Sequence, residues 1–345
     1  MAILGPGMMI STNMLAITII WLSAYRIDAG NLQIGDMMAF IQYAMQIFIS
    51  LMMITMILVM LPRAIASTER IKAVFAQPFQ VTGPEQSGDV SPPSMPVRSG
   101  HLSFNDVTFR YPNAKTPSVN RVSFEAYSGE TIAIIGCAGS GKSTLLDLLL
   151  RYYDVESGEI MIDGVNIRQM PQESLRAQIG YVPQHAVLFA GSMYENIRMG
   201  KQDATDEEVH QACKIALASE FIEQMPDGYN TVISQGGKNL SGGQRQRLCI
   251  ARALVRHPKI YVFDDSFSAL DYYTDARLRA KLKEETREAI VVIVTQRVSH
   301  IIRMDRIFVM DNGRIIGSGS HHELLETSAI YKEIVYSQLS EKEIG

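Results

Sequence analysis

Two long stretches without a charged side chain limit what this chain can form. One covers residues 1–25 and the other covers residues 37–61. Each exceeds the roughly 20 residues that a helix needs to cross the core of a bilayer. The polar segment RIDAGNLQIGD, which contains Gly30 and Gly35, lies between them. The pattern predicts a transmembrane hairpin with helices over about 7–25 and 37–61, and a buried helix pair in a soluble protein is the alternative.

The basic residues predict how this hairpin is oriented. The connecting segment carries Arg26 together with two aspartates, whereas Arg63, Arg70 and Lys72 follow the second stretch. Cytoplasmic flanks carry the excess of lysine and arginine, so the chain after the hairpin is expected in the cytosol. A signal peptide is not favoured, because no basic segment precedes the first stretch and a second stretch follows. We therefore expect a multi-pass protein of the plasma membrane, with residues 1–75 as a partial transmembrane domain.

Composition bounds the remaining classes of function. The net charge of −4 gives no support for binding to nucleic acid. Cys137, Cys213 and Cys249 are scattered, which predicts neither a disulfide framework nor a metal site and fits a reducing cytosol. Residues 76–100 are rich in proline, glycine and serine, a composition that is typical of a linker.

Short apolar runs alternate with helical patterns across residues 101–345. LSFNDVTFRY alternates as a strand does, and the apolar run TIAIIG leads directly into the helical pattern GKSTLLDLLLRYY. The later runs IYVF and AIVVIV are each followed by a helical pattern as well. This order predicts an α/β domain with a largely parallel core sheet, and the early alternating strands suggest an antiparallel β edge.

Residues 136–143, GCAGSGKS, match the phosphate-binding pattern G-x-x-x-x-G-K-[ST] between a predicted strand and a predicted helix. The glycines let backbone N–H groups approach phosphate oxygens, and the helix N-terminus adds a favourable dipole. Lys142 would reach the β- and γ-phosphates, and Ser143 would bind Mg²⁺. Cys137 has an alternative role as a small filler of the loop. The predicted nucleotide-binding residues here are Gly136, Cys137, Ala138, Gly139, Ser140, Gly141, Lys142, Ser143 and Thr144.

Two later segments suit the same ligand. Asp264 ends the apolar run IYVF, and a P-loop site needs a second strand whose terminal aspartate holds Mg²⁺ directly or through water. Residues 240–254, LSGGQRQRLCIARAL, place a polar, glycine-rich turn before an amphipathic helical pattern. Ser241 and Gly242 would then stand at a helix N-terminus, which is a second anion site. A glycine turn without a function is the alternative for this segment.

The order and spacing of the P-loop, LSGGQ and Asp264 resemble those of ATP-binding cassette (ABC) proteins. The resemblance covers residues 101–340 and implies a P-loop NTPase fold with a helical subdomain, using ATP and Mg²⁺. It implies that Tyr111 stacks on adenine and that Gln184, at the end of YVPQ, contacts the nucleotide, the metal and the reacting phosphate. SALD resembles the D-loop. The LSGGQ residues that the resemblance assigns to ATP are Ser241, Gly242, Gly243 and Gln244.

The resemblance extends into the hairpin. RAIASTERI, before the predicted linker, resembles the end of the last membrane helix in ABC exporters. A half-transporter of that family carries six spans before its nucleotide-binding domain, and the two predicted here look like the fifth and sixth. The chain thus resembles the C-terminal part of a multidrug-type or lipid-type exporter subunit, with residues 101–345 as the nucleotide-binding domain. It is expected to be a fragment or to begin at a downstream start at Met1.

Three residues depart from the pattern of active family members. Asp265 stands where those members have a glutamate that acts as general base toward the attacking water, and its carboxylate falls about an ångström short. Gln296 stands where they have a histidine, and glutamine neither carries charge nor shuttles a proton. Gln235 likewise replaces a glutamate common in exporters. The catalytic residues of this chain's own site would be Asp265, Gln296 and Gln184, and the site is expected to bind ATP well and hydrolyse it poorly.

The resemblance also implies a partner. In the family two cassettes face head to tail, and each ATP lies between the P-loop of one chain and LSGGQ of the other. The intact LSGGQ could complete an efficient site on a second ABC half-transporter, so a heterodimer is favoured over a homodimer. Membrane lipid and an unidentified exported small molecule complete the expected partners. The alternatives are a homodimeric exporter that uses Asp265 as a slow base, a soluble cassette protein in translation or DNA repair, and an ATP-binding regulatory module without transport.

Overall fold

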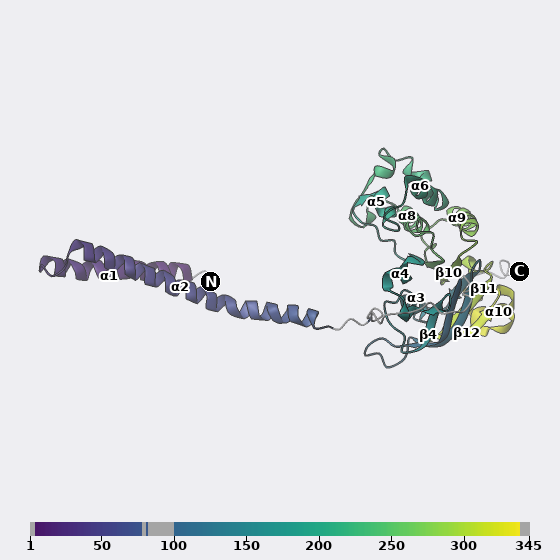
Figure 1. The fold of residues 1–345 in the computed structure, drawn as a ribbon, viewed down its shortest axis with the longest axis horizontal. Helices are drawn as coiled ribbons and strands as arrows, with labels where there is room; N and C mark the ends of the chain where they lie inside the picture. Colours follow the sequence, from purple (N-terminus) through teal and green to yellow (C-terminus); the bar gives the residue numbers. More distant parts are fainter. Residues whose placement is uncertain (1–3, 78–80, 82–99, 339–345) are drawn as a thin grey trace. The chain divides into compact units, whose positions relative to one another are not determined.

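The computed structural model describes residues 4–77, 81 and 100–338 (Figure 1). The chain forms two units, with the boundary between residues 79 and 80. The predicted linker, residues 76–100, therefore lies almost wholly outside the described residues. The N-terminal unit is helical, and the C-terminal unit contains all of the described strands.

Two antiparallel helices, α1 (Leu4–Asp28) and α2 (Ile34–Phe75), form the N-terminal unit and lie side by side (Figure 1). Both are long and apolar enough to cross a membrane. Their apolar side chains are almost all exposed, and no described residue of α2 is buried. An apolar surface of this extent needs lipid or further helices to cover it.

The second helix is longer than the sequence predicts. With 42 residues it extends about 63 Å, twice the thickness of a bilayer core. It continues past residue 61 because the segment RAIASTERIKAVF consists largely of good helix formers. Pro62 lies inside the helix and does not end it. The charged residues in the last turns of α2 thus belong to the same continuous helix as the apolar stretch.

A six-stranded sheet forms the centre of the C-terminal unit. Its order is β12-β11-β3-β10-β9-β6, and every neighbouring pair is parallel except β11 with β12. The strands are β3 (Thr131–Ile135), β6 (Ile179–Val182), β9 (Ile260–Asp264), β10 (Ile290–Thr295), β11 (Arg306–Asp311) and β12 (Arg314–Gly319). This sheet confirms the predicted α/β class with a parallel core.

The early alternating strands form a sheet of their own. Strands β1 (His101–Phe109), β2 (Val119–Tyr127), β4 (Ser157–Ile162) and β5 (Val165–Asn166) pair antiparallel in the order β2-β1-β4-β5. Aromatic rings join the two sheets: Phe124 stacks on Phe104 within its own sheet, with ring centroids 4.5 Å apart, and lies 5.1 Å from the tilted ring of Phe308 on β11. The leucines of α3 (Lys142–Leu149) belong to the same core, so the helix that follows the P-loop is held against both sheets.

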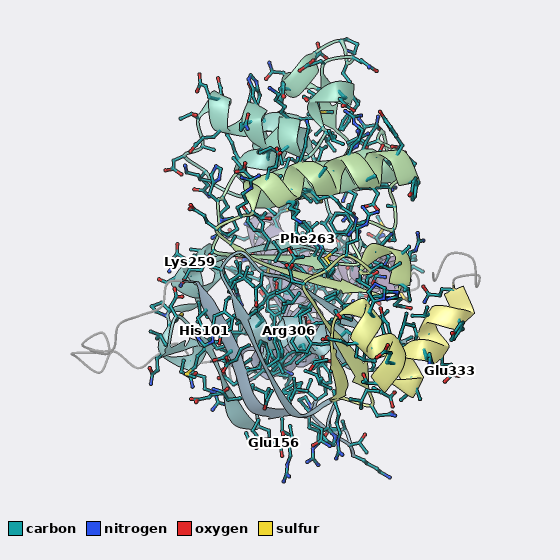
Figure 2. All side chains as sticks on the ribbon, turned by 90° about the vertical axis from the view of Figure 1, so that its right-hand side faces the viewer. His101, Glu156, Lys259, Phe263, Arg306 and Glu333 are labelled. Carbon is teal, nitrogen blue, oxygen red and sulfur yellow. The ribbon has the colours of Figure 1, made fainter. Side chains whose placement is uncertain are left out.

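Helices gather above the sheets in a separate layer (Figure 1). They are α5 (Met193–Arg198), α6 (Asp206–Ile215), α7 (Ser219–Ile222), α8 (Gly242–Leu254) and α9 (Tyr272–Glu285), with a short ribbon of β7 (Gly191–Ser192) and β8 (Val232–Ile233). A common hydrophobic cluster joins them to β9 and β10. Phe263 on β9 belongs to this cluster and lies in the interior of the unit (Figure 2).

Two C-terminal helices, α10 (His321–Thr327) and α11 (Ala329–Gln338), pack on the face of the core sheet opposite α3. Tyr331 and Val335 are fully buried in a third cluster with residues of β3 and β11. Glu333 marks the outer face of α11 (Figure 2). The remaining described helices are α4 (Gln172–Ala177) and the 3₁₀ turns η1 (Ile167–Gln169), η2 (Gly228–Asn230), η3 (Gln235–Gly237) and η4 (Val298–His300).

Candidate nucleotide-binding site

Residues 136–141 connect β3 to α3 in a loop that only glycine permits at two positions. A Cβ atom at Gly136 would stand 2.2 Å from the Met310 carbonyl oxygen. At Gly141 the φ angle is +101°, and a Cβ atom would stand 2.4 Å from the Ser118 carbonyl oxygen. The loop therefore fits closely against the end of β11 and the segment before β2, and its residues 137–139 are exposed.

Lys142 folds back over this loop. Its Nζ donates to the carbonyl oxygens of Gly136 and Cys137, each at 2.7 Å, and to Ser140 Oγ at 3.2 Å. Burial lowers the pKa of Lys142 below its ordinary value, and the nearby Asp264 and Asp265 carboxylates oppose that shift. Neutral carbonyl groups are weaker partners for an ammonium than phosphate oxygens are. The side chain is thus poised to exchange these contacts for an anionic ligand.

The loop opens onto a cavity of about 880 Å³ at the carboxyl ends of the parallel strands. This is where open α/β sheets bind ligands, and the volume suits a nucleotide. The sequence-predicted residues that line it are Ala138, Gly139, Gly141, Lys142, Ser143, Thr144, Gln184, Asp264, Asp265 and Gln296. Segments more than a hundred residues apart in the chain therefore meet in one site.

Asp264 stands at the end of β9, partly buried. Tyr181 Oη donates to its Oδ2 at 3.3 Å. Burial raises the pKa of Asp264, the Tyr181 hydrogen bond opposes that shift, and the neighbouring Asp265 carboxylate adds to it. A carboxylate in such surroundings is stabilised by a bound cation. Ser143 and Gln184 line the same cavity and supply further oxygen donors.

These donors fit Mg²⁺ as nucleotide sites hold it. Among the described residues no group of three or more His, Cys, Asp and Glu side chains could hold a metal ion. Mg²⁺ is usually bound by one or two carboxylates together with phosphate oxygens of the substrate and water. Asp264 and the Ser143 hydroxyl match that pattern, because they leave most ligand positions to the phosphates.

Asp265 has an unusual backbone conformation. Its φ angle is +43°, in the left-handed region that aspartate tolerates better than most residues. Its N–H donates to the Val294 carbonyl oxygen at 2.7 Å, and Thr295 Oγ1 donates to its Oδ1 at 3.0 Å. The carboxylate is thus held at the end of β10 by a buried hydroxyl. Gln296 follows Thr295 in the chain and lines the cavity.

Comparison with known proteins identifies the domain. The family model described as ABC transporter matches residues 119–268. The chain carries an ABC transporter ATP-binding domain. It is 40% identical over its full length to an uncharacterized ABC transporter ATP-binding protein of Mycobacterium tuberculosis strain H37Rv, covering 59% of that protein. It is 36% identical over 94% of its length to the ATP-dependent lipid A-core flippase of Chromobacterium violaceum, covering 54% of that protein.

The fold agrees with a solved exporter. A bacterial Atm1-family ABC exporter with ATP bound matches 96% of this chain and 57% of its own chain, with a TM-score of 0.79 and 32% identity. The chain thus spans between a half and three fifths of the length of these three relatives. This match confirms the predicted α/β P-loop fold preceded by a hairpin of two helices.

Some predicted residues of the ATP-binding domain do not line the cavity. Gly136, Cys137 and Ser140 shape the loop instead, and Ser140 is buried and accepts from Lys142. Tyr111 packs edge-on against Phe109 and Tyr153. Its Oη lies 3.3 Å from Thr144 Oγ1 and donates to Asp147 Oδ2 at 3.3 Å, and burial raises its pKa. The ring that was expected on adenine therefore lies against α3 in this structure.

The LSGGQ residues lie in the helical layer and are not among the residues that line the cavity. Ser241 is the N-cap of α8: its Oγ accepts from the Gln244 N–H at 3.2 Å, and Gln244 Oε1 accepts from the Ser241 N–H at 2.9 Å. This reciprocal pair is a capping box. Gly242 and Gly243 form the first turn of α8. Ser241 and Gly242 are exposed, so the N-terminus of α8 is open to solvent, although the rest of the helix is largely buried.

One wall of the cavity contains no residue that the sequence predicted. It consists of Thr116, Pro117, Ser118 and Asn120 before and within β2 and of Asp311, Asn312, Gly313 and Arg314 at the β11–β12 turn. The Gly313 N–H donates to the Ser140 carbonyl oxygen at 3.0 Å, and the Gly313 carbonyl accepts from the Asn120 N–H at 2.8 Å. The Asn312-Gly313 pair is a strong signal for a hairpin turn. It could have located the turn but not its contact with the P-loop.

Proposed function

We propose that this chain is an ATP-binding/permease subunit of an ABC exporter, and that ATP with Mg²⁺ occupies the cavity. The observation that carries the proposal is the meeting of Lys142, Ser143 and Asp264 at the carboxyl ends of β3 and β9. Loop N–H groups and the start of α3 would bind the phosphates, with Lys142 on the β- and γ-phosphates. Ser143, Asp264 and Gln184 would hold the metal, which neutralises phosphate charge when bound.

The chain's own site is proposed to hydrolyse ATP slowly. A general base must stand within hydrogen-bond reach of the attacking water. Asp265 is one methylene shorter than the glutamate of active members, and its backbone and Thr295 hold it at the sheet edge. Gln296 can donate a hydrogen bond to the γ-phosphate but cannot carry a positive charge. Both shortcomings concern the same water and phosphate, so they act together on one step.

A second half-transporter is the proposed partner. Ser241, Gly242 and Gly243 at the start of α8 would contact ATP bound by that partner, and Tyr111 would turn to stack on adenine in this chain's own site. The proposed layout is a partial transmembrane domain over 1–75, a linker over 76–100 and a nucleotide-binding domain over 101–345, placed in the plasma membrane with the latter domain in the cytosol. The exported substrate would be a small molecule or lipid.

One observation favours a homodimeric exporter as the second candidate. Asp265 lines the cavity, and the Thr295 hydroxyl orients its carboxylate. An oriented carboxylate is a working base if the attacking water can move toward it, which would make two identical slow sites sufficient for transport.

ATP binding tests the core of the proposal. Lys142→Ala should weaken binding of Mg–ATP by the purified chain at least tenfold, because hydrogen bonds to charged groups contribute about 1.5–3 kcal/mol each. The matched control is Lys283→Ala, which removes the same charge from an exposed position on α9. Calorimetry or a fluorescent nucleotide gives both affinities. Equal affinities for wild type and Lys142→Ala would refute the assignment of the cavity.

The partner role needs a separate experiment, with the chain coexpressed with its candidate half-transporter. Ser241→Ala should lower steady-state ATPase activity by roughly a hundredfold or more, the cost of losing one donor to a reacting oxyanion. Asp265→Asn should change it little. Ser192→Ala is the control for the lost helix cap, because Ser192 caps α5 with the same capping box. If Asp265→Asn is as damaging as Ser241→Ala, the homodimer candidate replaces this proposal.

A further inference from the structure

The segment that leaves β10 at the cavity is held from outside by the C-terminal helix. We call residues 296–300 the switch segment. Gln338, the last residue of α11, makes two hydrogen bonds to its backbone: Nε2 donates to the Gln296 carbonyl oxygen at 2.7 Å, and Oε1 accepts from the Val298 N–H at 2.9 Å. One amide side chain thus spans the segment whose first side chain faces the nucleotide cavity.

The sequence of α11 places this amide where an apolar residue is expected. Tyr331, Val335 and Gln338 follow at spacings of four and three, so they share one face of the helix. The first two are fully buried, in the same cluster as the fully buried Val298 of the switch segment. Gln338 continues that face beyond the core, and its amide meets the polar backbone there. The apolar contacts fix the helix, and the amide fixes the segment.

A second side chain holds the same segment from the site. Thr295 Oγ1 accepts from the Arg297 N–H at 3.1 Å while it donates to Asp265 Oδ1. Polar backbone groups of three consecutive residues, 296–298, are therefore bound by two side chains. Because a side chain can only be placed as well as its own backbone, these bonds determine where the Gln296 amide can point.

We infer that Gln338 is a positioning residue, which holds Gln296 so that its amide reaches the γ-phosphate of bound ATP. The inference rests on the proposed function. It makes the C-terminal helix part of the nucleotide site, although α11 itself contributes no residue to the lining of the cavity. Loss of the Gln338 amide would release the switch segment and leave the hydrogen bonds of Lys142 and Asp264 in place.

Discrimination between ATP and ADP tests this role, because the proposed contact exists only with the γ-phosphate. Affinities for Mg–ATP and Mg–ADP are measured with the full chain for wild type, Gln338→Leu, Gln296→Ala and the double variant. Gln338→Leu should lower the preference for ATP over ADP by about threefold to tenfold, the loss expected for one hydrogen bond. ADP affinity should stay at the wild-type value. The double variant should lose no more than Gln296→Ala alone, because both changes remove the same contact.

Two further variants keep the test decisive. Ser337→Ala is the matched control, because Ser337 precedes Gln338 and its hydroxyl donates only to the Ile334 carbonyl in its own helix. Gln338→Glu keeps the acceptor for the Val298 N–H and loses the donor to Gln296, so it should lie between wild type and Gln338→Leu. An unchanged ATP-to-ADP ratio in Gln338→Leu overturns the inference, as does an equal loss of both nucleotides. Neither result touches the P-loop assignment, which fails only if Lys142→Ala binds ATP as wild type does.

Discussion

Restoring the two replaced residues should raise ATP turnover. The perturbation is Asp265→Glu combined with Gln296→His. One added methylene extends the carboxylate by about 1.5 Å, the length of a carbon–carbon bond. A misplacement of about 1 Å can cost roughly a hundredfold in rate, so the double variant should gain up to about a hundredfold, or about 2.7 kcal/mol of barrier. Each single change should gain much less, because base and switch residue act on the same water and phosphate.

The structure predicts that this gain carries a cost in stability. The φ angle of +43° at Asp265 suits aspartate, whose short side chain tolerates the left-handed region, and suits glutamate less well. The longer side chain must also leave or lengthen its bond from Thr295 Oγ1. Together these effects should lower the free energy of unfolding by about 1–2 kcal/mol. For a domain of this size that corresponds to a fall in Tm of a few degrees.

Phosphate release by the purified chain in lipid nanodiscs provides the assay, at concentrations where two copies associate. Wild type, both single variants and the double variant are compared at saturating Mg–ATP, and thermal unfolding is followed in parallel. If wild type turns over ATP at a rate within a few-fold of the double variant, Asp265 is already an adequate base. The argument from side-chain length would then be wrong.

Three further outcomes follow from single positions. Gly136→Ala should weaken Mg–ATP binding and lower the free energy of unfolding by about 1–3 kcal/mol, because its Cβ atom would meet the Met310 carbonyl oxygen at 2.2 Å; calorimetry and urea unfolding measure both. Thr295→Val should lower the free energy of unfolding, measured in urea, by about 1–3 kcal/mol, because the Arg297 N–H loses its acceptor. Burial lowers the pKa of His321, whose ring shares a hydrogen bond with the Tyr331 hydroxyl. The stability that the neutral imidazole contributes is therefore present above about pH 6.5 and should be lost as the pH falls below that value. Tm measured at pH 7.5 and 5.5 checks this, and His321→Gln should reduce the difference between the two values.

The architecture could be predicted because it depends on features that are local in sequence. Five-residue apolar strands and the glycine loop before Lys142 are each marked by their own residues, and parallel strands then bring their carboxyl ends to one edge. The meeting of Lys142, Asp264 and Gln296 follows from that rule. The end of α2 could not be predicted in the same way, because loss of hydrophobicity after residue 61 does not end a helix when most of the residues that follow Pro62 are good helix formers.

Contacts between segments that are distant in the chain could not be predicted, because they leave no local pattern in the sequence. The β11–β12 turn supports the P-loop through a backbone N–H of Gly313, and the switch segment is held through the backbone by Gln338. A backbone partner imposes no residue type at its own position. Only the glycine that allows the approach, or the polar residue that breaks an apolar stripe, marks such a contact in the sequence.

Ser241, which is proposed to contact the ATP of a partner chain, illustrates how two requirements can share one side chain. As the N-cap of α8, it accepts from the Gln244 N–H, an acceptor role that leaves its hydroxyl proton available. The LSGGQ segment is thus specified twice, once by the need to begin a helix and once by any anion that this helix N-terminus binds. Capping alone is equally well served by Ser192 or Thr205, neither of which precedes a pair of glycines. The glycines after Ser241 leave the first-turn N–H groups open to a ligand, so they, rather than the serine, separate an anion site from an ordinary helix start.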